Sequence, residues 1–383
     1  MTRILVLGTA DWNQPIATNQ HYVVRELAQK NPLTFVESMG LRTPELSVRD
    51  VKRAARRLSP SKPTGTRATR AIPAGVTVVS PKAIPRHVGL ARQFNARVVD
   101  RFAEEWASSS EFRILWTYSP VTYGLEQVAD AVVYHCVDLL GKVEGIPEQL
   151  IDSSERTLTQ RADVAIGSSG RVVEHLKEIG FPSVVSWPNV ADTKIISEHR
   201  PPEVQRQRGR VVFAGNLSTT KIDFDLLRAV AESGADLHLA GPIAEGGGSA
   251  DSEVRDLERA GATYHGMLSL DALADLYWTA DVGLIPYALN PYTSGVSPLK
   301  TYEYLAAGLT VVSTALPSMN PVQNAVLVSD SRASFLTDLS VALGDDNSDG
   351  HESRIALANA HSWSQRGVEA RTIITELEAR HAE

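Results

Sequence analysis

The strongest constraint on the fold of this chain is a repeated alternation of short apolar runs with amphipathic segments. The first series predicts strands near 3–8, 33–37, 76–80, 112–117, 131–137, 163–168 and 183–187, with helices at about 17–30, 88–107, 147–162 and 169–178. The second series predicts strands near 210–214, 235–240, 262–265, 281–286, 309–313 and 325–328, with helices between them. Short apolar strands that alternate with helices are typical of parallel sheets covered on both faces. We therefore expect an α/β protein with two doubly wound sheets.

A polar, proline-bearing stretch at 197–210, SEHRPPEVQRQRGR, separates the two series. The length of 383 residues also favours two domains over one. We predict one domain over 1–196 and a second over 197–361, with an amphipathic helix at 362–381 that packs back on the first. Two such domains would face a cleft at the carboxyl ends of their strands, where ligands of doubly wound folds bind.

The cysteine content, the hydropathy and the charge of the chain indicate its cellular location and the kind of partner it binds. Cys136 is the only cysteine, so no disulfide can form within the chain and a cytoplasmic location is expected. No apolar run is long enough to span a membrane, and the apolar stretch in MTRILVLG is too short for a signal peptide. Residues 42–101 hold 14 Lys and Arg against three acids, although the net charge of the chain is −7.

This basic segment predicts an anionic partner, such as the inner surface of the cell membrane, a lipid-linked sugar or a polyanion. The alternative is a solvated surface that balances acidic residues elsewhere. Nucleic acid is not expected as a partner, because no aromatic residues are interleaved with the basic ones.

Residues 281–317 carry the clearest functional pattern. A buried-strand pattern runs into a glycine-bearing loop, and a helix is predicted to begin with Ser297 as its N-cap and Pro298 as its first residue. Such a helix start presents N–H groups and the positive end of the helix dipole, which attract phosphate. Lys300 and Glu303 lie three residues apart and so share one face of this helix. A cation for a diphosphate beside a carboxylate for a ribose diol is the chemistry that a nucleotide-sugar site requires.

With these residues in view, nearly the whole chain resembles glycosyltransferases of the GT-B fold, which have two Rossmann-like domains. The segments that carry the resemblance in the second half are RVVFAGNLSTTKIDFDLL (210–227), DLHLAGP (236–242), ATYHGMLSLDALADLYWTADVGLIPY (262–287) and SPLKTYEYLAAGLTVVST (297–314). Those in the first half are ILVLGTADWNQPIATNQHYVVRELA (4–28) and VVYHCVDLLGKVEGIPEQLIDSSERTLTQRADVAIGSS (132–169); the latter looks like bacterial glucuronosyltransferases of exopolysaccharide synthesis and transferases of the teichuronic-acid type.

The resemblance implies that the first domain binds the acceptor and the second binds a nucleotide-sugar donor, most simply a UDP-sugar. The acceptor would be a cell-surface glycan intermediate, a lipid-linked sugar or a small natural product. Retaining family 4 enzymes carry two glutamates eight residues apart, but Gly295 stands eight residues before Glu303. This departure favours an inverting enzyme.

An inverting transferase needs a general base for the acceptor hydroxyl, and hydrogen-bond donors or cations for the departing diphosphate. The resemblance places the catalytic base at Asp138, just after the strand 131–137. Asp11, in the loop after the first strand, is the competing candidate. It could be the base with Asp138 as support, or it could position the acceptor instead. Asn19 and His21 lie on the acceptor side, although a helical histidine is more often a hydrogen-bonded structural residue. Asp138 could likewise be a plain turn residue at a strand end.

The predicted donor site lies in the second domain. Lys300 and nearby loop N–H groups would hold the diphosphate, Glu303 the ribose, and the turn at His265 the nucleobase. A solvated ion pair is the alternative for Lys300 and Glu303, and a plain turn is the alternative for His265. The full predicted donor set is Gly215, Asn216, His265, Gly266, Tyr292, Ser294, Gly295, Ser297, Lys300 and Glu303.

No metal or other cofactor is expected. Asp223 and Asp225 form a D-x-D pattern, but they open a predicted helix and read as charges on its first turn. The alternatives to a transferase are a sugar-nucleotide epimerase, which shares the two-domain architecture, and a non-catalytic subunit that binds a nucleotide sugar. A nicotinamide dehydrogenase is disfavoured because GTADWNQ (8–14) lacks the G-x-G-x-x-G spacing.

Overall fold

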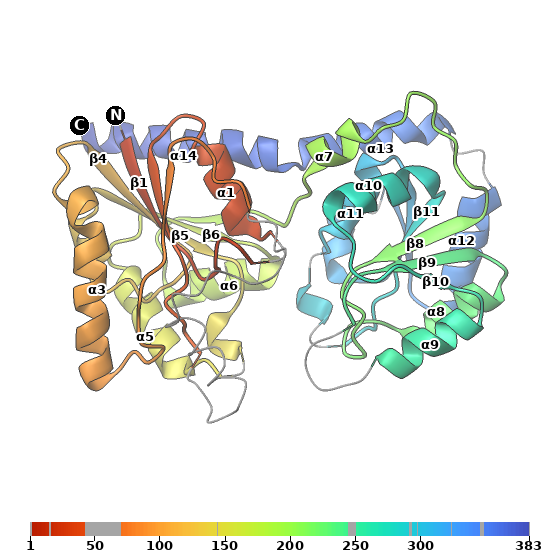
Figure 1. The fold of residues 1–383 in the computed structure, drawn as a ribbon, viewed down its shortest axis with the longest axis horizontal. Coiled ribbons are helices and arrows are strands. Elements are labelled where there is room, and N and C mark those ends of the chain that lie inside the picture. The colour runs from red at the N-terminus through yellow and green to blue at the C-terminus, as the bar shows by residue number, and fades with distance from the viewer. Residues whose placement is uncertain are drawn as a thin grey trace. The chain divides into compact units, whose positions relative to one another are not determined.

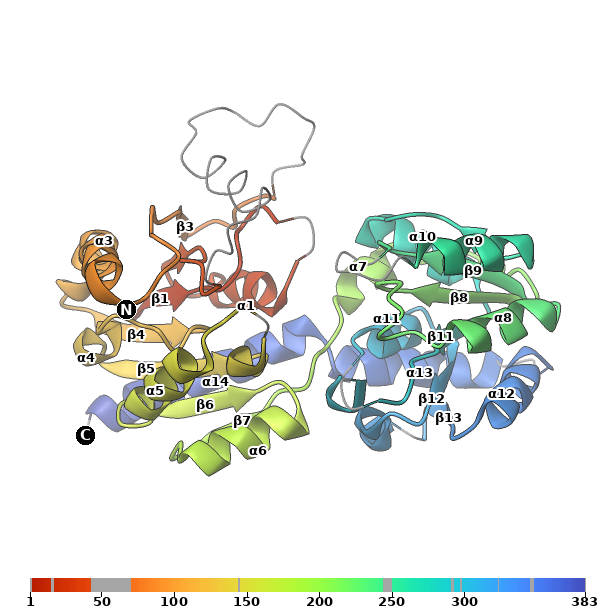
Figure 2. The same ribbon diagram turned by 90° about the horizontal axis from the view of Figure 1, so that it is seen from below.

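The structure is a computed structural model that describes residues 2–14, 17–42, 70–143, 145–243, 250–290, 293–296, 298–322, 324–344 and 348–382. The chain divides into two compact units (Figures 1 and 2): unit 1 comprises residues 1–188 and 366–383, and unit 2 comprises residues 189–365. Among the described helices, none combines the length and the apolar character that crossing a bilayer requires.

Unit 1 is built on a seven-stranded parallel sheet with the order β3-β2-β1-β4-β5-β6-β7. The strands are β1 (Thr2–Leu7), β2 (Leu33–Val36), β3 (Val76–Val79), β4 (Phe112–Thr117), β5 (Ala131–Cys136), β6 (Val164–Gly167) and β7 (Val184–Ser186). The helices are α1 (Asn19–Leu27), α3 (Gly89–Ala107), α4 (Leu125–Val128), η1 (Leu140–Lys142), α5 (Glu148–Leu158), α6 (Gly170–Ile179) and α14 (Trp363–Ala382), the last of which starts in unit 2.

One face of this sheet packs on α3, α5 and α6 through a cluster that includes Leu115, Tyr134 and Leu176. The helices α1 and α14 lie together on the other side of the unit. The Arg371 guanidinium of α14 donates to the Glu26 carbonyl oxygen at 3.1 Å, and Thr2 of β1 is hydrogen-bonded to Glu378. The sheet therefore has helices on both faces, as the strand–helix alternation predicts.

Unit 2 is built on a six-stranded parallel sheet with the order β10-β9-β8-β11-β12-β13. The strands are β8 (Arg210–Ala214), β9 (Asp236–Ala240), β10 (Thr263–Tyr264), β11 (Val282–Ile285), β12 (Thr310–Thr314) and β13 (Val326–Ser329). The helices are α7 (Thr193–Glu198), α8 (Phe224–Glu232), α9 (Asp251–Arg259), α10 (Leu270–Thr279), η2 (Thr293–Gly295), α11 (Lys300–Ala306), η3 (Pro317–Val322), α12 (Arg332–Gly344) and α13 (Ser348–Ala360).

Helices α8, α9 and α12 pack beside one another on one side of this sheet, and α7, α10, α11 and α13 pack beside one another on the other. The predicted strands of both series are present, and each sheet is wholly parallel. The predicted fold class, two doubly wound α/β sheets, is therefore confirmed.

The division between the units differs from the predicted boundary by a few residues. The predicted boundary at 196/197 falls inside α7, whereas the contacts divide the chain at 188/189. The reason is that α7 packs on α10 and α11 of unit 2, and the Trp278 indole N–H donates to the Ile196 carbonyl oxygen at 2.7 Å. The polar stretch 197–210 therefore begins at the end of α7, whereas the structural division lies before this helix.

Each sheet has one point at which the strand order reverses. In unit 1 this switch lies between β1 and β4, and in unit 2 it lies between β8 and β11. Loops that leave the carboxyl ends of two such strands run in opposite directions and leave a crevice, which is where doubly wound folds bind ligands. The two switch points therefore define where to look for a site in each unit.

Candidate functional site

Three glycines line the carboxyl edge of the unit 2 sheet at neighbouring strands. Gly215 follows β8, Gly241 follows β9, and Gly266 lies two residues after β10. A methyl group on Gly241 would lie 1.9 Å from the Gly215 carbonyl oxygen, and the Gly241 N–H donates to the Gly266 carbonyl oxygen at 2.7 Å. These backbones touch because no side chain stands between them. The Gly215 backbone fills the space beside Gly241, whereas nothing lies within 4 Å of a methyl group added at Gly266. A phosphate or a sugar can therefore approach the backbone closely at Gly266.

Gly241 is absent from the residues that the sequence singled out, although a signal for it exists. Both β8 and β9 end in Ala-Gly, as FAGN and LAGP. Gly241 has φ +132°, which a residue with a side chain rarely adopts. Asn216, which the sequence did single out, is exposed next to Gly215.

His265 is exposed at the end of β10 and is held by a chain of polar contacts. Its Nε2 lies 2.8 Å from Nδ1 of His238, whose Nε2 lies 3.1 Å from Oδ1 of Asp236. A carboxylate can only accept, so His238 carries its proton on Nε2 and accepts at Nδ1 from His265. Burial lowers the pKa of His238, with a further contribution from Arg210, which favours this neutral form. In the neutral form of His265, Nδ1 is then a hydrogen-bond acceptor.

The pair Lys300 and Glu303 lies on α11, which follows the loop after β11. Lys300 Nζ donates to Glu303 Oε2 at 2.6 Å, and the buried Tyr277 hydroxyl donates to the same oxygen at 2.9 Å. The Glu303 side chain is 5% exposed and that of Lys300 is 20% exposed. The pair is thus largely buried and is not the solvated surface ion pair that the sequence left open as the alternative.

Helix α11 is anchored to the switch point. The Tyr304 hydroxyl accepts from the Ala214 N–H at 2.8 Å, where β8 ends. The Tyr304 ring packs over Gly283 of β11, where a methyl group would lie 2.4 Å from the ring. One tyrosine therefore fixes the face of α11 that carries Lys300 and Glu303 beside the crevice between β8 and β11.

The start of α11 differs from the sequence expectation. The helix begins at Lys300 after Leu299, two residues later than predicted, and Ser297 lies outside the described residues, as does Tyr292. The Thr301 N–H bonds to the Pro298 carbonyl oxygen at 3.2 Å, so a tighter turn precedes the helix. Ser294 and Gly295 form part of η2, and the Ser294 N–H already donates to the Asn290 carbonyl oxygen at 3.0 Å. That N–H is therefore engaged within the loop.

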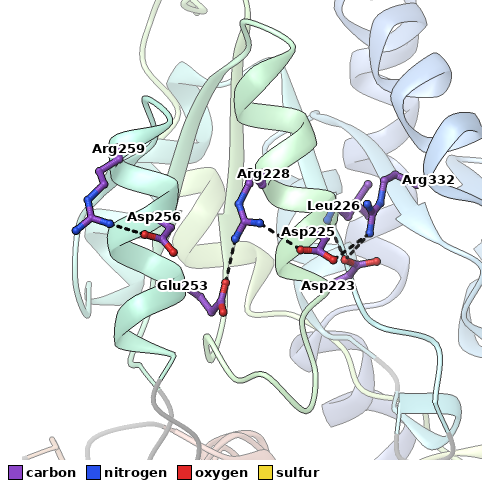
Figure 3. A network of polar contacts seen from close by, with 8 residues as sticks. All are labelled: Asp223, Asp225, Leu226, Arg228, Glu253, Asp256, Arg259 and Arg332. Atoms are coloured by element: carbon purple, nitrogen blue, oxygen red, sulfur yellow. Dashed lines mark hydrogen bonds and ion pairs between the residues drawn. The ribbon is translucent and has the colours of Figure 1, made fainter.

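Asp223 and Asp225 belong to a surface network that joins α8, α9 and α12 (Figure 3). The Asp223 carboxylate caps α8 by accepting from the Leu226 N–H at 2.8 Å, and Arg332 lies 3.5 and 3.6 Å from the two aspartates. Arg228 bridges Asp225 and Glu253 at 3.3 and 3.2 Å. The D-x-D pattern therefore serves the helix start, and in the described part of the chain no three His, Cys, Asp or Glu side chains come together to hold a metal ion.

The candidate bases of unit 1 are both exposed at the carboxyl edge of the sheet. Asp138 follows β5 and Asp11 follows β1, with β4 between these two strands. Two strand spacings separate β1 from β5 by about 10 Å. Asp11 and Asp138 lie four and two residues beyond the ends of these strands, in loops at the same edge of the sheet.

His21 is 4% exposed and forms part of the local structure of the β1–α1 loop. The Thr18 N–H donates to Nδ1 at 3.0 Å, so Nε2 carries the proton and lies 3.3 and 3.2 Å from the Asp11 and Trp12 carbonyl oxygens. Burial lowers the pKa of His21, with a further contribution from Arg70. His21 therefore has the structural role that the sequence left open beside acceptor binding, as a hydrogen-bonded histidine. Asn19, the other residue predicted on the acceptor side, is the first residue of α1 and is half-buried.

A small depression lies at the switch point between β1 and β4. It contains about 250 Å³ of empty space, part of it open to solvent, and its lining includes Thr9, Ser38, His87 and Ser119. His87 donates from Nε2 to the Gly40 carbonyl oxygen at 2.9 Å and accepts at Nδ1 from the Tyr123 hydroxyl at 2.6 Å. Sequence reasoning missed His87 because its partners lie 36 and 47 residues away along the chain.

Comparison with known proteins shows a similarity to glycosyl transferases. Residues 208–345 match the family described as glycosyl transferases group 1. The putative teichuronic acid biosynthesis glycosyltransferase TuaH of Bacillus subtilis is 27% identical over 258 residues, which cover 61% of this chain. The match covers 64% of TuaH, which is less than two thirds of its length.

Solved structures match the whole chain at low sequence identity. Sucrose-phosphate synthase from Thermosynechococcus elongatus has a TM-score of 0.64 at 14% identity, with 99% of this chain and 100% of that chain covered. The E. coli trehalose-6-phosphate structure bound with UDP-2-fluoro glucose has a TM-score of 0.64 at 12% identity and 98% coverage of both chains. Anabaena Alr3699/HepE in complex with UDP and glucose has a TM-score of 0.60 at 14% identity, with 96% and 99% covered. The chain has the GT-B fold, and its residues 208–345 are similar to the family of group 1 glycosyl transferases.

Proposed function

We propose that this protein is a glycosyltransferase that uses a nucleotide-sugar donor, most simply a UDP-sugar. The observation that carries the proposal is the buried Lys300–Glu303 pair beside the glycine-lined edge of unit 2, within the part that matches the group 1 family. The bound UDP and UDP-sugar analogue named for two proteins of the same fold support the choice of uridine.

The donor would be held by complementary groups on α11. The Lys300 ammonium has three N–H donors, and one of them is used on Glu303 among the described residues. The other two would bind the diphosphate. The two hydrogen bonds that described residues donate to Glu303 both end on Oε2, and Oε1 would take the ribose diol. The acceptor Nδ1 of His265 matches a base with an imino N–H, which uracil has. No metal ion is part of this proposal.

The acceptor hydroxyl would be deprotonated by a carboxylate of unit 1, with Asp138 as the first candidate and Asp11 as the second. The acceptor would be a cell-surface glycan or lipid-linked intermediate, with a small natural product as the other candidate. The name of the B. subtilis relative, which refers to teichuronic acid biosynthesis, supports a cell-surface polymer. The protein would then work at the inner face of the cell membrane.

Lys300→Ala tests donor binding directly. We expect UDP affinity measured by titration calorimetry to fall about tenfold or more, because a charged hydrogen bond to the diphosphate is worth about 1.5–3 kcal/mol. Lys194→Ala is the matched control, since Lys194 is an exposed lysine of unit 2 whose ion-pair partner among the described residues is Glu198, at 3.7 Å. Equal UDP affinity in Lys300→Ala and Lys194→Ala would show that the diphosphate does not bind at Lys300 of α11.

Asp138→Asn tests the base and should retain UDP binding while turnover is lost. Normal turnover in this variant, together with loss of turnover in Asp11→Asn, would assign the base to Asp11. Release of UDP only when an acceptor is present would separate a transferase from a sugar-nucleotide epimerase, because an epimerase acts on the donor alone.

We further propose inversion at the anomeric carbon, since Gly295 occupies the position of the first glutamate in the E-x7-E pattern. Group 1 enzymes typically retain the anomeric configuration. Proton NMR of the first product formed distinguishes the two outcomes, and a product with the configuration of the donor would overturn inversion.

A further inference from the structure

Exposed apolar side chains gather on one part of unit 1. Among the described residues, five of the twelve large apolar side chains that are exposed fall between 72 and 94: Ile72, Ile84, Val88, Leu90 and Phe94. Leu90 is 82% exposed and Phe94 is 45% exposed, and they lie one turn apart on α3. The other seven are scattered between 128 and 368. Contiguous exposed apolar surface of this kind marks an interaction site.

A buried asparagine holds this surface in place. Asn95 is 0% exposed, and its side-chain amide donates to the Ile84 and Arg86 carbonyl oxygens at 2.8 and 3.2 Å. Its side-chain oxygen accepts from the Ile84 N–H at 2.8 Å. The segment before α3 is thereby fastened to the first turns of the helix. Ile84 and Val88 are therefore held out beside Leu90 and Phe94 by specific bonds and do not project from a free loop.

The same surface is basic. From Arg70 to Val99 the chain has five Lys and Arg and no Asp or Glu. Lys82, Arg86 and Arg97 are exposed, and Arg97 follows Phe94 by three residues on α3, so the two share a face of the helix. None of these three side chains forms an ion pair with a residue that the structure describes. Among the described residues, basic side chains thus lie along the same segment as the apolar ones without forming ion pairs.

We propose that this apolar–basic patch, formed by Lys82, Ile84, Arg86, Val88, Leu90, Phe94 and Arg97, docks on the surface of an anionic lipid bilayer. Arginine and lysine are attracted to acidic headgroups, and leucine, phenylalanine, valine and isoleucine enter the boundary between headgroups and acyl chains. Docking itself does not depend on the proposed function. Its role, which is to bring unit 1 to a lipid-linked acceptor, rests on the proposed function.

The combination of charge and apolar surface favours a bilayer over two other occupants. A second copy of the chain, paired through the same patch by a twofold axis, would bring the same basic groups face to face without acids between them. A soluble polyanion would engage the basic groups and leave four apolar side chains in water. A bilayer with acidic lipids satisfies both parts of the patch at once.

Cosedimentation with vesicles tests the proposal on the full chain. Vesicles of phosphatidylcholine alone are compared with vesicles that contain about one third phosphatidylglycerol, at low and at high salt. We expect binding to the acidic vesicles that weakens at high salt, since the charge part of the attraction is screened. Absence of binding to acidic vesicles at low salt would overturn the proposal, and so would equal binding to both kinds of vesicle.

Two pairs of variants separate the apolar part from the basic part. The double variant Leu90→Ser/Phe94→Ser should lower the partition coefficient about tenfold or more, and its control is Val341→Ser, which replaces an exposed apolar residue on α12. Arg86→Gln/Arg97→Gln should lower it about fivefold for each charge removed, and its control is Arg259→Gln on α9. Leu90→Ser alone repeats the apolar test at the most exposed position if the double variant folds poorly.

UDP affinity is measured on every variant and should stay at the wild-type value. Unchanged vesicle binding by the patch variants would overturn docking while leaving the donor assignment intact. A dimer that dissociates on Phe94→Ser, without any binding to acidic vesicles, would assign the patch to self-association and refute the bilayer.

Discussion

Gly241→Ala is expected to destabilise unit 2 much more than the same exchange at Gly234. At Gly241 the new methyl group would lie 1.9 Å from the Gly215 carbonyl oxygen, and φ is +132°. At Gly234 φ is +87° and nothing lies within 4 Å of the added methyl group. The two exchanges therefore share a backbone cost, and only Gly241 adds a steric one.

The magnitude follows from these two contributions. Backbone strain at a disfavoured φ costs about 1–3 kcal/mol, and forcing an atom into a filled space costs about 1–3 kcal/mol more. We take about 4 kcal/mol for Gly241→Ala and about 1 kcal/mol for Gly234→Ala. For a unit of about 180 residues, each kcal/mol lowers Tm by about 2–4 °C. Gly241→Ala should therefore melt about 8–16 °C below the wild type, and Gly234→Ala about 2–4 °C below.

Differential scanning calorimetry measures both shifts on the full chain, and titration with UDP below the melting range reports the effect on the donor site. Gly241→Ala should weaken UDP binding because the ends of β8 and β9 must move apart, whereas Gly234→Ala should not. Melting temperatures that agree within about 2 °C would mean that Gly215 and Gly241 are not in contact.

Three further exchanges test other contacts. Tyr277→Phe removes a buried donor to Glu303 and should cost about 1.5–3 kcal/mol of unfolding free energy in urea titrations; a cost below about 0.5 kcal/mol would show that this hydrogen bond is not formed. Arg206→Ala removes the donor to the carbonyl oxygens of Ala280 and Ala307, the C-cap residues of α10 and α11. It should lower the free energy of unfolding by about 2–3 kcal/mol. The control Arg259→Ala replaces an exposed arginine and should change this free energy by no more than about 0.5 kcal/mol. Burial in an aromatic cluster lowers the pKa of His135 to about 3, with a further contribution from Arg366. The unfolded chain has a histidine pKa of about 6.5, so it takes up the proton first as the pH falls. The contribution of neutral His135 to the free energy of unfolding is therefore complete above about pH 6.5 and is lost progressively as the pH falls to about 3. Between pH 7 and pH 5 the free energy of unfolding of the wild type should fall by about 2 kcal/mol more than that of His135→Gln. An equal fall in the two proteins would show that His135 is not the group that takes up this proton.

The strands could be predicted from the sequence because each is a short apolar run bounded by turn residues, and parallel strands buried on both faces need little else. The positions of Lys300 and Glu303 could be predicted as well, because residues three apart on a helix share a face. Their burial could not, because it depends on Tyr277, which comes from α10 more than 20 residues earlier in the chain.

Local rules failed where tertiary contacts decide. Ser297 and Pro298 form a good helix start by sequence, but the regular helix begins only at Lys300, after a tighter turn. His87 is unremarkable in sequence, and its role depends on Tyr123 and Gly40, which only the folded sheet brings to it. His21 is the reverse case, since its partner Thr18 lies three residues away and a local hydrogen bond could have been foreseen.

The course of α14 has a consequence for how the protein folds during its synthesis. Ala370, Ile374 and Leu377 are buried in unit 1, although all of unit 2 precedes them in the chain. The ribosome therefore synthesises all of unit 2 before it synthesises the part of α14 that packs on unit 1. While the roughly 180 residues of unit 2 are added, the side of the unit 1 sheet that α14 covers stays exposed to solvent. A nascent chain stalled before residue 366 should accordingly present a protease-resistant second half attached to a susceptible first half.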